Sequence, residues 1–94
     1  MITEKDIEKR LKESIEARGQ LCIKMQSNHI NGMPDRLCTL PEGRVVWVEL
    51  KAPGRKPRKL QRFVHEQLRS RGQRVEVVST YEEVEELMAK YYAE

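Results

Sequence analysis

The sequence of 94 residues has few aromatic side chains, no long apolar run and only two cysteines. Aromatic residues make up 5% of the chain, and no stretch approaches the ~20 apolar residues that a membrane helix needs. The first ten residues, MITEKDIEKR, lack the apolar core of a secretory signal peptide. We therefore expect a cytoplasmic protein with no membrane partner.

Several reactive motifs are also missing. Cys22 and Cys38 lie in apolar, strand-like segments without CxxC spacing, so we interpret them as reduced core thiols rather than a disulfide or zinc ligands. The chain has no Ser/His/Asp arrangement, no glycine-rich phosphate loop and no zinc-ligand spacing. The sequence therefore gives no support to serine, P-loop or zinc chemistry.

What the chain does contain is charge, at 35% of its residues, and this charge is unevenly distributed. Residues 51–74 hold nine Lys and Arg against one acid, Glu66, whereas residues 80–94 hold five acids against Lys90. A basic block beside an acidic tail indicates a polyanionic partner such as nucleic acid. A solvated basic helix is the plainer alternative.

Apolar periodicity and turn signals predict one α/β domain over residues 1–94, in the order α-β-β-β-α-β-α. Helices are predicted between Thr3 and Gly19, from Pro57 to Gly72, and after a capping box at Ser79 or Thr80. Strands are predicted at 20–26, 35–40, 44–51 and 74–79.

Two helices carry apolar stripes that need cover. The second helix is expected to bury Leu60, Val64 and Leu68, together with Phe63. The last helix has a broad stripe made of Val84, Leu87, Met88, Tyr91 and Tyr92. That stripe is expected to pack either within the chain or across a twofold axis, and a chain this short often gains stability by forming oligomers.

The two middle strands are predicted to form a hairpin around the turn "PEG". In that register paired residue numbers sum to 84, so Asp35 lies opposite Glu49. Opposed residues of an antiparallel pair point to the same face, about 5 Å apart. Lys51, two residues after Glu49, projects from that face as well. The hairpin therefore brings three charged side chains together at its open end.

Two carboxylates this close repel each other unless a proton or a cation lies between them. Hard oxygen ligands favour Mg²⁺ or Mn²⁺, which keep several waters. A metal next to Lys51 would suit phosphodiester hydrolysis, because both stabilise charge that develops on the phosphate. The alternative is a cross-strand salt-bridge cluster with no ligand.

The first helix offers a third acid for this site. Glu4 falls on the same helical stripe as Ile7, Leu11 and Ile15, and Glu8 flanks that stripe. An acid within an apolar stripe is unusual. Glu4 is therefore our first choice for an extra metal ligand and Glu8 the second, against the alternative of solvated first-turn acids favoured by the helix dipole.

These residues carry a resemblance to a known family. "PD" at Pro34-Asp35, thirteen intervening residues, and "ELK" at residues 49–51 resemble the PD-(D/E)xK nuclease motif. The match extends through "EKDIEKRL", "IKMQS", "GMPDRL", "VVWVELKAPGRK", "KLQ" and "SRGQRVEVVS". Over nearly its whole length the chain is similar to the compact VRR-NUC family.

The resemblance implies a restriction-endonuclease-like fold, with a mixed central sheet flanked by helices, and a nuclease dependent on Mg²⁺ or Mn²⁺. Asp35 and Glu49 would bind the metal, and Lys51 would be the catalytic lysine. Gln61 matches a glutamine that the family carries on the next helix, although an exposed helix residue is the alternative. The N-terminal helix acid of the family is matched better by Glu4 than by Glu8.

Further residues are candidates for contacts with DNA. Lys24 matches a lysine on the strand before the PD motif, or is simply a surface residue. His29, in the loop "SNHIN", is a candidate phosphate contact or general base, although an ordinary polar loop residue is the plainer interpretation. His65 has no visible partner in the sequence. The residues expected to contact DNA phosphates are Arg55, Lys56, Arg58, Lys59 and Arg62.

Stand-alone members of the family resemble phage-encoded Holliday junction resolvases, which act as dimers. This resemblance implies a homodimer that cuts branched DNA, with a four-way junction as the expected substrate, in the cytoplasm of a bacterial host. Two alternatives stay open. One is a flap or single-strand nuclease with the same active site, and the other is a nucleic-acid-binding module without catalysis.

Overall fold

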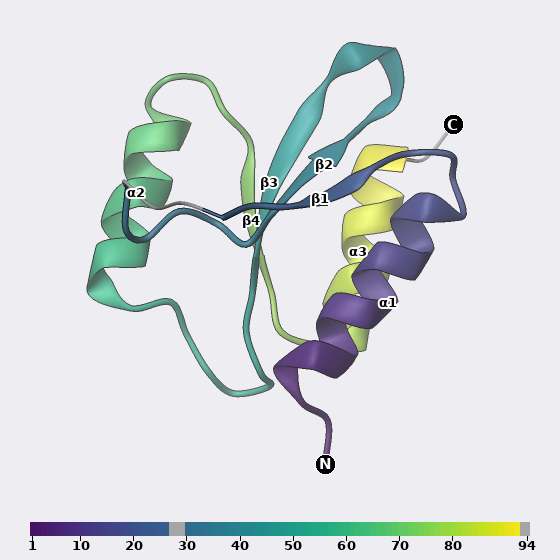
Figure 1. Cartoon of the computed structure of the whole chain (residues 1–94), viewed down its shortest axis with the longest axis horizontal. Helices are drawn as coiled ribbons and strands as arrows, with labels where there is room; N and C mark the ends of the chain where they lie inside the picture. The colour runs from purple at the N-terminus through teal and green to yellow at the C-terminus, as the bar shows by residue number, and fades with distance from the viewer. Residues whose placement is uncertain (27–29, 93–94) are drawn as a thin grey trace.

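The computed structural model describes residues 1–26 and 30–92. A mixed four-stranded sheet lies between α1 and α3 on one face and α2 on the other (Figure 1). The elements are α1 (Glu4–Glu16), β1 (Cys22–Lys24), β2 (Arg36–Thr39), β3 (Val45–Leu50), α2 (Lys59–Arg69), β4 (Val75–Val78) and α3 (Tyr81–Tyr92). The predicted fold class and element order are confirmed, although most elements are shorter than expected.

The register of the sheet agrees with the prediction. The strands lie in the order β1-β2-β3-β4, with antiparallel pairs β1–β2 and β2–β3 and a parallel pair β3–β4. Arg36 pairs with Val48 and Thr39 with Val45, so paired numbers in the β2–β3 hairpin sum to 84. The hairpin turns through the short helix Pro41–Gly43.

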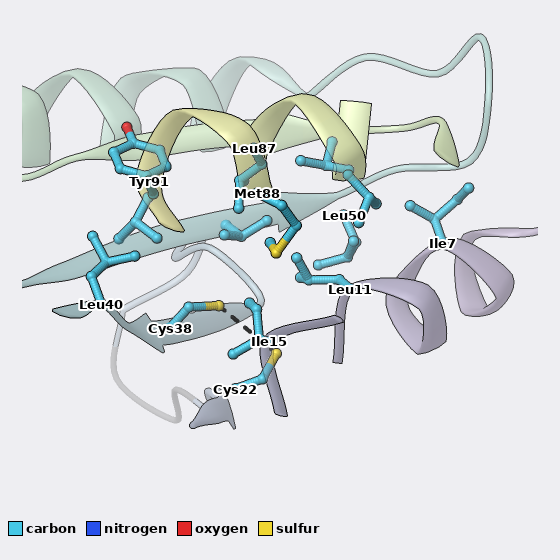
Figure 2. Close-up of a cluster of buried hydrophobic side chains, with 14 residues drawn as sticks. Ile7, Leu11, Ile15, Cys22, Cys38, Leu40, Leu50, Leu87, Met88 and Tyr91 are labelled. Atoms are coloured by element: carbon cyan, nitrogen blue, oxygen red, sulfur yellow. Dashed lines mark hydrogen bonds between the residues drawn. The ribbon is translucent and has the colours of Figure 1, made fainter. Parts of the chain in front are cut away.

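One face of the sheet carries the hydrophobic core, which α1 and α3 cover (Figures 1 and 2). Ile7, Leu11 and Ile15 of α1 are fully buried there. Cys22 and Cys38 are free, buried thiols with their Sγ atoms 3.8 Å apart, as predicted for reduced core cysteines. The stripe of α3 belongs to this same core, which settles its packing in favour of the contact within the chain.

The helix α2 covers the opposite face, and here the predicted stripe is partly wrong. Its buried residues are Gln61, Val64 and His65. Leu60 and Phe63 are instead 50% and 60% exposed. The reason is that α2 packs over the end of β3 where Glu49 lies, so polar side chains that satisfy this acid face inward.

The ends of the helices follow local sequence signals. Thr3 caps α1, and Thr3 and Asp6 exchange side-chain-to-backbone hydrogen bonds as a capping box. The second helix begins at Lys59 rather than at Pro57, with Arg58 as its N-cap. Within the described residues, none of the helices combines the length and apolar character needed to cross a membrane.

Candidate active site

The site is built around a buried acid at the end of β3. Glu49 is 1% exposed, which is unusual for an ionisable side chain. The strand's alternation places Val46, Val48 and Leu50 in the hydrophobic core and turns Glu49 toward α2. Asp35 lies just before β2, where the continued β2–β3 register places it opposite Glu49, and its charge acts on the Glu49 carboxyl group.

Three side chains besides Asp35 surround the carboxylate of Glu49. Gln61 Nε2 donates to Oε2 over 3.2 Å, and His65 Nε2 lies 3.2 Å from Oε1. Lys51 Nζ is 3.9 Å from Oε2, with the lysine side chain 14% exposed. Both oxygens of the carboxylate therefore have a partner on α2, and the ammonium group of Lys51 lies near Oε2.

The surroundings of Glu49 favour its neutral form. Burial is the largest cause that raises its pKa to about 8, followed by the hydrogen bond with Asp35 and the charge of Asp35. Lys51 acts in the opposite direction. A pair of adjacent carboxyl groups that holds a proton at neutral pH is also a pair that a divalent cation would stabilise.

Asp35 is held by the backbone of the next strand and by the loop that precedes it. The N–H of Leu50 donates to Asp35 Oδ2 over 2.8 Å. Upstream, Gly32 adopts a φ of +89° and packs so tightly on α2 that a Cβ there would lie 3.0 Å from the carbonyl oxygen of Leu60 and from Cγ2 of Val64. Glycine is therefore required where this loop crosses the helix.

The amide of Gln61 connects the site to the start of α2. Its Oε1 accepts from the N–H of Arg58 over 2.8 Å, while its Nε2 donates to Glu49. Because a backbone N–H only donates, the oxygen must face Arg58, and this fixes the orientation of the amide. One side chain thus caps the helix and holds the buried acid.

A basic depression opens beside Lys51. It has a volume of about 390 Å³ and is lined by Glu4, Lys51, Ala52, Arg55, Lys56 and Arg58. Glu4 is exposed and begins α1, so the first helix delivers an acid to the same opening as the catalytic-lysine candidate. Lys59 and Arg62 are also exposed on α2, and Arg62 Nη1 donates to the carbonyl of Pro57 over 2.7 Å.

Other predicted site residues lie apart from this group. Glu8 forms an ion pair with Arg36. Lys24 pairs with Arg36 and through it with Val48, so Lys24 lies on the opposite face of the sheet from Glu49. The prediction for His29 falls outside the described residues.

His65 is the residue that the sequence reasoning missed. It is 2% exposed and reaches Glu49 from the helix turn after Gln61. Burial lowers its pKa, and the charges of Arg69 and Lys51 act in the same direction. The available signal was spacing, because residues four apart on a helix share a face and Gln61 was already assigned to the site.

The donor set suits a small, hard cation. Mg²⁺ is commonly held by one or two carboxylates and several waters, and Asp35 and Glu49 supply two neighbouring carboxylates. Within residues 1–26 and 30–92, no group of three or more His, Cys, Asp or Glu side chains is arranged to hold an ion. The residues therefore fit a water-rich site rather than an all-protein cage.

Two comparisons with known proteins find nucleases or nuclease domains. No model of a known protein family matches the chain. The chain is 39% identical over 80 residues to "Putative nuclease p44" of Acyrthosiphon pisum secondary endosymbiont phage 1, which covers 85% of this chain and 86% of that protein. A solved structure described as a VRR_NUC domain matches with a TM-score of 0.89 and 36% identity, over 98% of this chain and 100% of that one.

Proposed function

Because this chain belongs to the VRR-NUC family of nucleases, we propose that it is a metal-dependent endodeoxyribonuclease that cuts branched DNA as a homodimer. The observation that carries the proposal is the buried Glu49 beside the half-buried Asp35, with Lys51 close to Glu49. A purely structural ion pair would not need two adjacent acids around a single lysine. Its burial would also be costly without a cation.

The chain's own residues would divide the work. Asp35 and Glu49 would hold Mg²⁺ or Mn²⁺, which supplies a Lewis acid that polarises the phosphate and makes a water more acidic. Lys51 would place its charge against the phosphate as negative charge develops there. Gln61 would keep Glu49 oriented. The basic residues around the depression would hold the DNA backbone, with Glu4 as the additional acid at its rim.

The homodimer rests on apolar surface at α2 rather than at α3. Leu60 and Phe63 are exposed on α2, and an apolar depression of about 310 Å³ beside them is lined by Ile30, Met33, Phe63, Val64, Gln67, Leu68 and Arg71. A twofold partner would cover this surface. It would also give two matching active sites for the two symmetry-related strands of a four-way junction.

The decisive experiment compares wild type with Lys51→Ala and Glu49→Gln on four-way junction, flap and single-stranded DNA, in Mg²⁺, Mn²⁺ or chelator. We expect wild type to make paired cuts in the junction only with metal, and both variants to bind the junction without cutting it. Normal cleavage by Lys51→Ala, or cleavage in chelator, would refute the active site. If the protein cuts flaps in preference to junctions, the nuclease assignment holds and the flap becomes the assigned substrate.

Light scattering on the free protein tests the homodimer. We expect a mass of twice 11.1 kDa at micromolar concentration and a shift toward the monomer in Phe63→Glu. A wild-type monomer that nicks junctions at random on either strand would contradict the resolvase assignment while leaving the nuclease intact.

A further inference from the structure

The contact between His65 and Glu49 is the most deeply buried polar contact at the site. The side chains are 2% and 1% exposed, and Nε2 lies 3.2 Å from Oε1. Within the described residues, no buried side-chain nitrogen or oxygen atom lacks a hydrogen-bond partner. His65 therefore occupies a position where an apolar residue would leave one oxygen of Glu49 without its partner.

The two α2 contacts use different oxygens of the same carboxylate. Gln61 donates to Oε2 and His65 contacts Oε1. An ionised carboxylate only accepts hydrogen bonds and offers about four lone pairs. When Glu49 is ionised, Nε2 of His65 must therefore carry the hydrogen, and each oxygen keeps a further lone pair for another ligand.

We propose that His65 is a positioning residue for the metal ligand Glu49, which it fixes through the Nε2 hydrogen bond to Oε1. This inference rests on the proposed function, because it gives the contact a role only if Glu49 binds a metal. A side chain that hydrogen-bonds to a metal ligand sets the orientation of that ligand. Loss of such a partner commonly lowers metal affinity or activity by about 10–100-fold. Gln61 contacts only Oε2, so without His65 no α2 side chain would hold Oε1.

The competing interpretation is a histidine that merely fills the interior beneath α2. The two roles differ in what a substitution changes. A filler affects thermal stability alone, whereas a positioning residue affects metal affinity in a protein that is still folded. An amide that reaches the same place as Nε2 should rescue metal affinity, because the role needs a donor at one position rather than an imidazole.

The test measures the dissociation constant for Mn²⁺ by calorimetry on the full chain without DNA. The variants are His65→Leu, which removes the donor, and His65→Gln, which replaces it. We expect His65→Leu to weaken Mn²⁺ binding by about 10–100-fold and His65→Gln to stay close to wild type. Met88→Ala, in the core on the opposite face of the sheet, is the packing control and should lower the melting temperature without changing the Mn²⁺ constant.

Each outcome is informative. If His65→Leu does not fold, His65→Asn replaces it, since its shorter amide falls short of Oε1. Equal Mn²⁺ constants in wild type and in the folded donor-lacking variant overturn the inference. A wild type that binds no Mn²⁺ overturns the proposed function itself. Cleavage by His65→Leu should recover as Mn²⁺ is raised, whereas an unchanged metal requirement also counts against the proposal.

Discussion

Arg36 in β2 holds the carboxylate of Glu8 in α1, with Nε and Nη2 each 2.9 Å from the same oxygen. The pair is largely buried, with side chains 10% and 22% exposed. Nη1 of Arg36 also donates to the carbonyl of Cys22 over 2.9 Å. One guanidinium thus ties the first helix to the two adjacent strands, and this commits Glu8 to the fold while Glu4 faces the basic depression.

Replacing these two acids should therefore have different effects. Glu8→Ala leaves a largely buried guanidinium without its carboxylate partner, and we expect it to lower the free energy of unfolding by about 1–3 kcal/mol. Glu4→Ala should leave stability nearly unchanged and raise the metal concentration needed for cleavage. Chemical denaturation and metal-titrated cleavage of each variant measure both effects. The opposite pattern would make Glu8 the ligand.

The raised pKa of Glu49 predicts how stability depends on pH in chelator. Between its usual value of 4.5 and about 8, the folded protein keeps a proton that the unfolded chain has released, so stability should fall as pH rises. The lowered pKa of His65 makes stability rise with pH instead, because the unfolded chain binds the proton more readily. This contribution ends near pH 6.5, the usual pKa of histidine. The range from pH 7 to pH 8 therefore separates the effect of Glu49 from that of His65.

Denaturant unfolding in that range, compared with Glu49→Gln, measures the effect. Wild type should lose stability with rising pH and Glu49→Gln should not, because its amide does not ionise. Parallel pH curves for the two proteins would mean that Glu49 is already ionised at neutral pH in the folded state.

Gly32 should be the glycine least tolerant of alanine. A Cβ there would lie 3.0 Å from a backbone oxygen and 3.0 Å from a side-chain carbon of α2, in addition to the strain of its positive φ. Gly72 is a matched control, since its φ is +82° and nothing lies within 4 Å of its would-be Cβ. Gly72→Ala should cost about 1–2 kcal/mol from backbone strain alone.

Gly32→Ala should cost more than that and should also reduce cleavage, because the clash pushes the loop that carries Asp35 away from the helix that carries Gln61. Melting curves and cleavage rates of the two variants report these effects. Equal losses in both would show that only backbone strain matters at Gly32.

The basic depression should determine affinity rather than turnover. Arg55→Ala combined with Lys56→Ala should weaken junction binding and reduce the slope of log affinity against log salt by up to about 1.8, since each lost phosphate contact contributes about 0.9. The cleavage rate at saturating DNA should change little. Lys12→Ala, on α1, is the control, and an equal change of slope in that variant would contradict the assignment.

The sequence was sufficient to predict the hairpin that brings the two acids together. The turn "PEG" and the alternation of Val46, Val48 and Leu50 fixed the register, because a slip of one residue would move the whole apolar set to the other face. The position of Glu49 opposite Asp35 follows from this register. Local signals such as the Thr3 cap were equally readable.

The interior of α2 could not be predicted in the same way. Hydrophobicity alone favours burying Leu60 and Phe63, yet the structure buries Gln61 and His65. The choice depends on what the helix packs against, and a helix over a buried acid needs donors rather than hydrocarbon. The buried acid lies in β3, so the sequence of α2 alone does not indicate which of its residues face inward. This becomes clear only when the helix is placed against the sheet.

The connections between the strands also order the events of folding. A three-residue turn joins β2 and β3, whereas α2 and its loops lie between β3 and β4. Local contacts form fastest, so we expect the hairpin to close before the crossover docks, and pulsed hydrogen exchange would show amides of β2 and β3 protected before those of α2. The acids meet early, and Gln61 and His65 reach them late. The hydrogen bonds around Glu49 would therefore be complete only after the crossover helix has docked on the sheet.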